Sequence, residues 1–367
     1  MHRIDRLKLK DFRAYETLDV AFGPGIHVIT GDNAQGKTSL IEAIYLLALS
    51  KSHRTSMDYA LIREGAKFAR IEGQGSVGDK PASFAMILSG EGKKAVYNKV
   101  EYKRLSDYIG LLKVVMFAPE DLVMIKGSPS ERRRFIDLEL GQANRHYLYH
   151  LAQYKKLLKE RNEHLKALQK QRSTDYTLLE VLSEQLVHYG KKLIESRRAF
   201  VDAIRPIFKR TIESLSGERV FDIIYEPSRE AFDLTTLKEK IKTDILMGTT
   251  TTGPHRDDIT FTLEDQPIKK AASQGQMRTV ALGIKLAVIE WLRTSQGTTP
   301  IILLDDVFSE LDVKRQRNII NHLTTDAQVF ITTTSLGALD HSALKSIKLW
   351  HVTQGTIKGV DSHEQNV

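Results

Sequence analysis

The first third of the chain alternates apolar and polar residues and then changes period. Leu7 and Leu9, and later Ile26 and Val28, follow the two-residue period of half-buried strands. From residue 38 to residue 49 the apolar residues recur at helical spacing instead. Further short strands, separated by glycine-rich turns, are predicted at residues 68–77, 83–88, 95–100 and 113–117. We therefore expect mixed α/β structure here.

From about Glu131 the period becomes purely helical. The apolar residues are spaced by three, four or seven positions, a pattern that predicts two long amphipathic helices. A break near residues 173–175 predicts an antiparallel hairpin, and Pro206 is expected to kink the second helix. The residues of the two apolar stripes are Tyr147, Leu151, Tyr154, Leu158, Leu165 and Leu168, then Leu182, Leu186, Leu193, Phe200, Ile204, Phe208, Ile212 and Leu215.

After Gly217 the α/β pattern returns. Strands are predicted at residues 258–263, 301–304 and 328–332, and helices at 274–293 and 313–323. The sequence thus predicts an α/β domain in two pieces, residues 1–125 and 217–367, with a helical arm at 126–216 inserted between them. Residues 361–367 are expected to form a loose tail.

Composition excludes several classes of protein. The 367 residues contain no cysteine, which removes disulfides, thiolate catalysis and cysteine-bound zinc. No run of about 18 apolar residues is present, and the first five residues lack the apolar core of a signal peptide. We therefore expect a cytoplasmic protein with no membrane partner.

Positive charge is concentrated in the predicted arm. Residues 126–216 hold 19 Lys and Arg against 11 Asp and Glu, an excess equal to the net charge of +8 of the whole chain. A basic segment beside a neutral remainder indicates an anionic partner such as nucleic acid.

A glycine-rich loop between the strand at 26–28 and the helix at 38–49 fits the pattern G-x-x-x-x-G-K-[ST]. Such a loop turns its N–H groups towards phosphates, its lysine reaches the β- and γ-phosphates, and its hydroxyl binds Mg²⁺. An ordinary glycine-rich turn is the alternative. The predicted site for ATP and Mg²⁺ consists of Gly31, Asp32, Asn33, Ala34, Gln35, Gly36, Lys37, Thr38 and Ser39.

Two carboxylates end the aliphatic strand at 301–304. Asp305 is predicted to bind Mg²⁺ together with Thr38, and Asp306 to act as the catalytic base that orients the attacking water. The alternative is a charged strand end that caps the next helix. The long separation between Lys37 and Asp305 agrees with an inserted arm.

A third motif precedes the helix at 274–293. Ser273, Gln274, Gly275 and Gln276 resemble the signature sequence of ABC-type ATPases, and residues 309–312 after the acidic strand resemble their D-loop. Each short motif alone is weak. Phosphate loop, signature, acidic strand and D-loop nevertheless occur in the order that ABC-type ATPases use.

Longer strings resemble the RecF family of recombination mediators over nearly the whole chain. They are residues 11–15 (DFRAY), 31–39 (GDNAQGKTS), 51–55 (KSHRT), 117–122 (FAPEDL), 127–135 (GSPSERRRF), 253–258 (GPHRDD) and 304–312 (LDDVFSELD). The resemblance implies an ABC-ATPase head, with a P-loop NTPase core and an antiparallel β part, that carries an inserted α-helical arm.

The resemblance also implies a mechanism. ATP would join two subunits into a homodimer on DNA, with Ser273, Gly275 and Gln276 of one subunit at the γ-phosphate bound by Lys37 of the other. Slow hydrolysis would release DNA, and RecO and RecR would cooperate in loading RecA at single-strand gaps. A weak, DNA-stimulated ATPase activity is expected.

Some positions depart from the ABC pattern. Asp306 stands where glutamate is common, which suggests slow turnover. Glu120 or Asp121 stands where most ABC proteins have glutamine, and Thr333 or Thr334 is expected to substitute for the switch histidine.

Four further residues lie in the strings that resemble the family. Arg13 and Arg54 are expected either to contact nucleotide or partner subunit, or to be ordinary surface arginines. His53 and His255 offer no set of metal ligands, so we expect isolated or core histidines.

The DNA contacts are predicted from clusters of basic residues. Backbone phosphates are met by Lys and Arg without sequence readout, so duplex or gapped duplex DNA is the expected ligand. The alternative is that these residues solvate the outer face of the arm, and the arginine triplet has the further option of pairing with acidic residues. The candidates are Arg132, Arg133, Arg134, Lys155, Lys156, Lys159, Lys191, Lys192, Arg197 and Arg198.

Three other functions stay open. A transporter ATPase subunit is disfavoured by the basic arm, and an SMC protein with a long coiled coil by the short insertion. A nucleotide-sensing scaffold without useful turnover is not separated from a DNA clamp by sequence.

Overall fold

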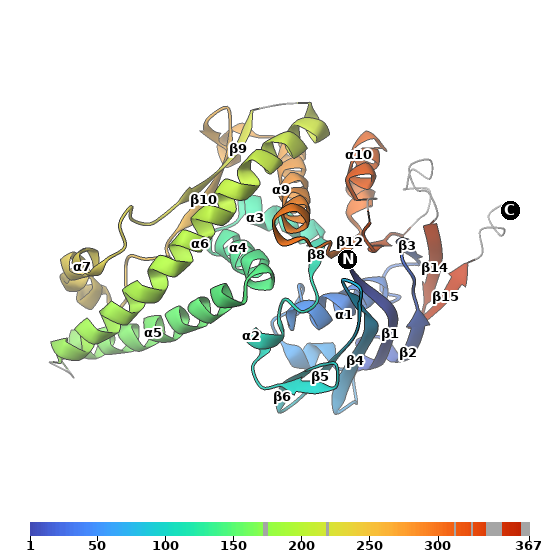
Figure 1. Ribbon diagram of the computed structural model, residues 1–367, viewed down its shortest axis with the longest axis horizontal. Helices are drawn as coiled ribbons and strands as arrows, with labels where there is room; N and C mark the ends of the chain where they lie inside the picture. Colours follow the sequence, from blue (N-terminus) through green and yellow to red (C-terminus); the bar gives the residue numbers. More distant parts are fainter. Residues whose placement is uncertain (172–174, 218–219, 312, 324–325, 335–346, 361–367) are drawn as a thin grey trace. The chain divides into compact units, whose positions relative to one another are not determined.

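The computed structural model describes residues 1–171, 175–217, 220–311, 313–323, 326–334 and 347–360 (Figure 1). The contacts divide the chain into two compact units. The first is Met1–Asp121, Glu213–Gly217 and Leu282–Val367, and the second is Leu122–Ile212 and Glu218–Ala281. Residues 218–281, which we assigned to the head from the sequence, thus group with the helices of the second unit. The predicted tail at 361–367, the break at 173–174 and Asp312 lie outside the described residues.

An antiparallel sheet forms one layer of the first unit. Its strand order is β2-β1-β4-β5-β6-β7. Leu7 and Leu9 of β1 are buried on either side of the half-buried Lys8, as the two-residue period predicted. The strand predicted at 68–77 is confirmed at both ends. The strands are β1 (His2–Phe12), β2 (Tyr15–Ala21), β4 (Phe68–Val77), β5 (Lys80–Ser89), β6 (Gly92–Tyr97) and β7 (Val100–Tyr102).

A second, mostly parallel sheet forms another layer of this unit. Its order is β15-β14-β3-β13-β12-β8, and only β15 runs antiparallel to its neighbour. Every residue of β3, β8, β12 and β13 is buried, which explains why their sequences are mostly apolar rather than alternating. The strands are β3 (Ile26–Thr30), β8 (Val114–Phe117), β12 (Ile301–Asp305), β13 (Val329–Thr332), β14 (Ile347–Thr353) and β15 (Thr356–Val360).

Helix α1 (Lys37–Leu49) lies between the two sheets. It contacts β4 and β5 of the antiparallel sheet and β12 and β13 of the parallel sheet. Eleven of its thirteen residues are buried, so its sequence is apolar nearly all round rather than along one stripe. The other helices of the unit are η1 (Asp58–Leu61), α2 (Leu105–Tyr108), η2 (Pro119–Asp121), η3 (Val307–Glu310) and α10 (Val313–Leu323).

The second unit is mainly helical. The predicted hairpin is formed by α5 (Arg145–Gln169) and α6 (Tyr176–Ser216), which Figure 1 shows converging beside α7 (Leu234–Met247). Contacts of Tyr147 with Arg197 and of Arg161 with Ser183 show that the helices are antiparallel. The helix α6 continues through Pro206. The predicted apolar positions are buried, except that Leu157 takes the buried place expected for Leu158.

Shorter elements complete this unit. A three-stranded sheet has the order β11-β10-β9, and its β10 matches the predicted strand at 258–263. None of the described helices is long and apolar enough to cross a membrane. The elements are α3 (Leu122–Lys126), α4 (Pro129–Ala143), β9 (Phe221–Glu226), β10 (Asp258–Leu263), β11 (Gln266–Pro267) and α8 (Ile268–Ala271), and α9 (Gln274–Gln296) begins here and ends in the first unit.

A fully buried ion pair ties α5 to α7. The side chains of Arg161 and Asp244 are both 0% exposed, and Nη1 of Arg161 donates to Oδ2 of Asp244 at 2.9 Å. Arg161 also donates to the hydroxyls of Ser183 (3.0 Å) and Thr250 (2.6 Å), while Asp244 accepts from the backbone of Thr251. A buried charge needs such partners because it has lost its hydration.

Removing the negative partner of this pair should destabilise the second unit strongly. In Asp244→Asn the guanidinium of Arg161 stays buried without a counter-charge, so we expect a loss of about 3–5 kcal/mol in the free energy of unfolding. Urea denaturation followed by circular dichroism measures it. The control Lys159→Ala removes an exposed lysine 3.9 Å from Glu163, and no measurable change is expected. Equal stability of both variants would contradict the assignment.

Candidate functional site

The predicted phosphate loop joins β3 to α1 with a backbone that glycine alone fits at two positions. Gly31 has φ +141°, and a Cβ there would lie 2.3 Å from the carbonyl oxygen of Val352. Gly36 has φ +115°, and a Cβ would lie 2.9 Å from the hydroxyl of Tyr15. That hydroxyl donates to the carbonyl of Gly36 at 3.0 Å. The two fixed glycines of the motif are thus required by the neighbouring strands β2 and β14.

Lys37 is the first residue of α1 and is buried against the loop. Its Nζ donates to the carbonyl oxygens of Gly31 (2.6 Å) and Asp32 (2.7 Å). Burial lowers the pKa of Lys37, and the carboxylates of Asp306, Asp305 and Asp32 oppose that shift. An ammonium group and the N-terminus of a thirteen-residue helix therefore meet at the loop, an arrangement suited to phosphate.

Thr38 and Asp305 meet across the parallel sheet, as the sequence predicted. Asp305 ends β12, and Oγ1 of Thr38 donates to its Oδ1 at 2.9 Å. The hydroxyl of Thr332, at the end of the intervening strand β13, donates to the same oxygen at 2.7 Å. Burial raises the pKa of Asp305, and the two hydroxyls oppose that shift. The start of α1 and the end of β13 thus converge on the carboxylate that ends β12.

Thr332 is a site residue that sequence reasoning missed. The prediction placed the substitute for the switch histidine at Thr333 or Thr334. In the structure, Thr332 pairs with Asp305 in the register of β12 and β13, and its hydroxyl also accepts from the backbone N–H of Asp306 at 3.0 Å. The signal that marks it is position, because side chains at the carboxyl ends of adjacent parallel strands share one edge of the sheet.

The Thr38–Asp305 pair fits a magnesium ion bound together with a nucleotide. Mg²⁺ is held by oxygen ligands, commonly one or two from protein, with phosphate and water supplying the others. The hydroxyl of Thr38 and the carboxylate of Asp305 provide such oxygens beside Lys37. The described part of the chain contains no cluster of three or more His, Asp or Glu placed to hold a metal.

Asp306 carries a strained backbone and an unused acceptor. Its φ of 51° and ψ of 24° lie in the left-handed region, which costs a non-glycine residue about 1–3 kcal/mol. Its Oδ1 is buried without a hydrogen-bond partner among the described residues. Ser309 of the predicted D-loop donates to the carbonyl of Asp306 at 2.7 Å. Strain and an unpaired acceptor at one residue are typical of functional positions.

The two carboxylates after β8 have different surroundings. Asp121 accepts from the backbone N–H of Ala118 at 2.9 Å and pairs with Lys285 at 3.0 Å. Glu120 is exposed, and its negative charge contributes to raising the pKa of Asp305. Of the two residues at the place of the usual glutamine, Glu120 is therefore the one whose charge acts on the acidic strand end.

Arg13 belongs to a buried network behind the phosphate loop. It donates to both carboxylate oxygens of Glu42 on α1, at 2.8 and 2.9 Å, and to the carbonyl of Ala60. The hydroxyl of Ser52 donates to the same carboxylate and accepts from the backbone N–H of Arg54 at 2.9 Å. The guanidinium of Arg13 is thus engaged inside the protein. The side chain of Arg54 is exposed, and its positive charge opposes the rise in the pKa of Asp305.

His53 and His255 differ sharply in their partners. His255 shares a hydrogen bond with the Tyr154 hydroxyl (2.7 Å) and one with the Thr250 carbonyl (2.9 Å), so it is a core histidine of the second unit. His53 packs edge-on against Tyr45, and both its ring nitrogens are buried without a hydrogen-bond partner. Its Nε2 lies 3.9 Å from Oδ2 of Asp305. Burial lowers the pKa of His53 to about 4 and that of His255 to about 4.

The signature residues form a reciprocal cap at the start of α9. The backbone N–H of Gln276 donates to Oγ of Ser273 at 3.2 Å, and the backbone N–H of Ser273 donates to Oε1 of Gln276 at 2.9 Å. This is a capping box, which satisfies two backbone donors of the first turn. Gln274 is exposed and Gly275 half-buried. Because Ser273 and Gln274 are exposed, the N-terminus of α9 is accessible on the second unit.

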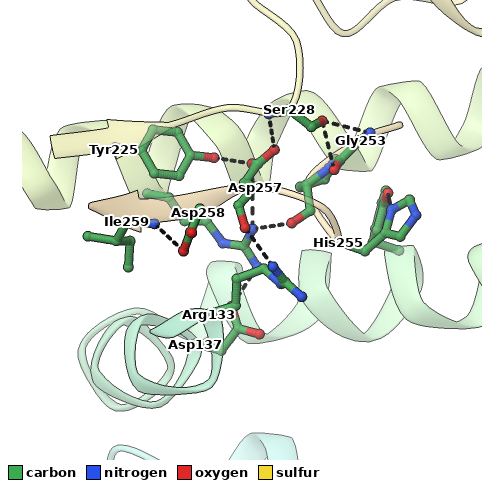
Figure 2. A network of polar contacts seen from close by, with 12 residues as sticks. Arg133, Asp137, Tyr225, Ser228, Gly253, His255, Asp257, Asp258 and Ile259 are labelled. Atoms are coloured by element: carbon green, nitrogen blue, oxygen red, sulfur yellow. Dashed lines mark hydrogen bonds and ion pairs between the residues drawn. The ribbon is translucent and has the colours of Figure 1, made fainter. Parts of the chain in front are cut away.

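Residues 253–258 are held by arginines of the second unit (Figure 2). Arg197 is buried and donates to the carbonyl of Pro254 (2.6 Å) and to Oδ1 of Asp137 (2.8 Å). Asp257 accepts hydrogen bonds from the hydroxyl of Tyr225 and the backbone N–H of Ser228. Residues 253–258 therefore contribute to the internal structure of the second unit. Arg197 is buried and is no longer a candidate for a DNA contact.

The side chains of residues 132–134, the arginine triplet, differ in burial. Arg132 is 5% exposed and forms a two-pronged pair with Asp258 at 2.7 and 2.8 Å, so the expectation that it meets DNA is corrected in favour of acidic pairing. Arg133 is half-buried and donates to the carbonyl of Asp257 at 2.6 Å. Arg134 is exposed and stays a predicted DNA contact.

The lysine candidates are exposed on α5 and α6. Lys155 lies 3.8 Å from Asp137, Lys156 3.9 Å from Glu160, and Lys192 3.3 Å from Glu195. Exposed pairs of this kind are weak and leave the ammonium groups accessible. Together with Arg134, the exposed candidates that remain are Lys155, Lys156, Lys159, Lys191, Lys192 and Arg198.

Comparisons with known proteins agree with this geometry. The family model described as RecF/RecN/SMC N terminal domain matches residues 3–358. The chain is 45% identical to the DNA replication and repair protein RecF of Halalkalibacterium halodurans, over 98% of this chain and 99% of that one. It is 43% identical to RecF of Bacillus cereus, over 96% and 98%.

Solved structures show the same relationship. A structure of the recombination mediator protein RecF with ATP in the RecFOR pathway is 29% identical, with a TM-score of 0.87 over 98% of this chain and 97% of that one. An SMC head bound to a winged-helix domain of ScpA, 17% identical with a TM-score of 0.56 over 97% of both chains, shares the fold. The chain belongs to the RecF family of DNA replication and repair proteins, within the wider RecF/RecN/SMC family.

Proposed function

We propose that this chain is an ATP-dependent, DNA-binding recombination mediator that acts in DNA repair and replication. The observation that carries the proposal is the 2.9 Å contact between Thr38 and Asp305, which joins the phosphate loop to the acidic strand end. The family membership and the relatives solved with nucleotide support it.

The nucleotide site is assigned residue by residue. The loop Gly31–Gly36, with the N-terminus of α1, binds the phosphates, and Lys37 and Ser39 lie at its helical end. Thr38 and Asp305 hold Mg²⁺, which neutralises phosphate charge when bound. Thr332 orients Asp305 through its hydroxyl, at 2.7 Å.

Hydrolysis is assigned to Asp306. Its buried Oδ1 has no internal donor among the described residues, so it is able to accept a proton or a hydrogen bond from the attacking water. An aspartate reaches less far than the glutamate common in ABC-type heads. Slow turnover follows from that shorter reach.

Asp306→Asn should retain ATP binding and lose hydrolysis. An amide does not accept the proton, so we expect the rate of phosphate release to fall about 10²-fold or more. The release is measured with saturating ATP, with and without duplex DNA, and binding is measured separately with a fluorescent ATP analogue. The control is Asp79→Asn, at an exposed turn distant in sequence. Unchanged hydrolysis in Asp306→Asn would exclude Asp306 as the base, and no hydrolysis in the wild type would favour a nucleotide-sensing scaffold.

Dimerisation is assigned to the capped N-terminus of α9. An exposed helix N-terminus with a serine hydroxyl suits a phosphate group, and in the proposed homodimer that phosphate belongs to the nucleotide bound by the other subunit. Two nucleotides would then join two copies of the chain. Loss of the γ-phosphate by hydrolysis removes one side of each contact and releases the dimer.

Ser273→Arg should block this dimer. A long cationic side chain disrupts the capping box and fills the space that a phosphate needs, so the mass with Mg-ATP should stay at the monomer value of 41.6 kDa. Light scattering of wild type should show a doubled mass with Mg-ATP. The control Ser295→Arg changes an exposed serine in the last turn of the same helix and should still dimerise. A wild-type mass that does not respond to ATP would refute the role of residues 273–276.

DNA binding is assigned to the exposed basic residues of the arm. The basic side chains offer positive charge for backbone phosphates, so the expected ligand is duplex DNA, or duplex beside a gap, bound without sequence readout. They are Arg134, Lys155, Lys156, Lys191 and Lys192. RecO and RecR are the proposed partners in loading RecA, by family membership.

The double variant Lys155→Ala with Lys156→Ala should weaken DNA binding without changing specificity. Each phosphate contact contributes about 0.9 to the slope of log K against log salt, so the slope should fall by about 1–2. Fluorescence anisotropy with two unrelated duplexes measures it. The control is Lys94→Ala with Lys99→Ala, two exposed lysines of the antiparallel sheet and its turn. Equal slopes for both double variants would indicate that the arm lysines only solvate the surface.

A further inference from the structure

His53 lies beside the proposed nucleotide site, and the function proposed above assigns it no role. Both of its ring nitrogens are buried, and neither has a hydrogen-bond partner among the described residues. Burying an unpaired polar group costs about 1–3 kcal/mol. A buried polar group without a partner in a native protein often gains its hydrogen bond in the functional state, for example when a ligand binds.

Other buried histidines show what a structural role looks like here. Nε2 of His27 bonds the carbonyl of Gly23 at 2.8 Å, and its Nδ1 accepts from Nε1 of Trp350 at 3.1 Å. His255 likewise has partners on both nitrogens. His53 makes neither kind of bond. Packing against Tyr45 accounts for an aromatic ring at this position. It does not account for two buried nitrogens without hydrogen-bond partners.

The backbone around His53 is fixed rather than adaptable. The hydroxyl of Ser52 accepts from the N–H groups of Arg54 (2.9 Å) and Thr55 (3.1 Å) and donates to the carboxylate of Glu42. Glu42 is fully buried on α1 and is held by both prongs of Arg13. The network thus anchors the segment to the helix that begins with Lys37 and Thr38.

A carboxylate oxygen of the proposed magnesium ligand lies close to the ring. Nε2 of His53 lies 3.9 Å from Oδ2 of Asp305. The other oxygen, Oδ1, already accepts from Thr38 and Thr332. A hydrogen bond from His53 to Oδ2 needs the two atoms about 1 Å closer, at about 2.9 Å.

We propose that His53 is a positioning residue for Asp305, donating a ring N–H to Oδ2 and fixing the carboxylate for the Mg²⁺ that accompanies the nucleotide. Direct ligation by the imidazole is disfavoured, because Mg²⁺ prefers oxygen ligands. A donor on the second oxygen stabilises the ionised carboxylate and its orientation, as outer partners of metal ligands do. The proposal rests on the nucleotide site proposed above.

His53→Phe tests the role because phenylalanine keeps the ring and removes the nitrogens. The measured quantity is the Mg²⁺ concentration that half-restores equilibrium binding of a fluorescent ATPγS analogue after EDTA treatment. Loss of an outer partner typically costs about 10–100-fold in metal affinity, so we expect that concentration to rise about 10-fold. Affinity for the analogue in EDTA should not change. The thermal midpoint without nucleotide should be unchanged or higher, because the variant buries no unpaired nitrogen.

Two further variants separate positioning from structure. His53→Gln returns an N–H donor to the position of Nε2 and should restore much of the Mg²⁺ response. His27→Phe removes two satisfied hydrogen bonds from a buried histidine of the same unit, so it should lower the thermal midpoint and leave the Mg²⁺ response unchanged.

The outcomes are distinct. An equal Mg²⁺ response in wild type and His53→Phe would overturn the role of His53 and leave the nucleotide site standing. A drop in the thermal midpoint of His53→Phe with no change in Mg²⁺ response would also overturn it, in favour of a structural role. Absence of Mg²⁺-dependent binding in the wild type would instead refute the proposed function.

Discussion

The register of three parallel strands determines where the chemistry of this protein is placed. Asp305 of β12 pairs with Thr332 of β13, and Thr332 pairs with Ile29 of β3. The loop after β3 therefore begins at the edge where β12 ends, and Thr38 reaches Asp305 across the end of the middle strand. A slip of one residue would turn Asp305 to the opposite face of the sheet. Because these strands are buried on both faces, packing with α1 resists such a slip.

Buried arginine–carboxylate pairs fix the loops in both units. In the first unit, Arg13 and Glu42 anchor the segment after α1. In the second, Arg161 with Asp244 and Arg132 with Asp258 hold the residues around 250–258. Such pairs add little net stability compared with apolar packing, but breaking one leaves a buried charge. Their effect here is to define loop positions, which a site that must match phosphate oxygens requires.

The sequence predicted most of the elements because their periods are clear. The strand at 68–77 and the helix at 313–323 match at both ends, and the fixed spacing of the phosphate loop located Lys37 and Thr38. Asp305 was predicted for the same reason, as the polar end of an apolar strand.

What the sequence left out depends on contacts between distant residues. Strand β14 pairs with β3 more than 300 positions away, and no local pattern shows that. Thr332 was missed because its role comes from the register of β13. Arg132 was predicted as a DNA contact because the sequence does not show whether an arginine is exposed or paired. Its partner, Asp258, lies 126 positions further along the chain. The unpartnered nitrogens of His53 are a property of packing, which composition does not report.

Calorimetric titration with ATPγS, in Mg²⁺ and in EDTA, tests the central claim most directly when wild type is compared with Asp305→Asn. The account predicts that Mg²⁺ strengthens binding to the wild type and that Asp305→Asn binds as the wild type does in EDTA but gains little from Mg²⁺. If Mg²⁺ strengthens binding to the variant as much as to the wild type, Asp305 does not hold the ion, and the meeting of the strand ends at Thr38 has another purpose.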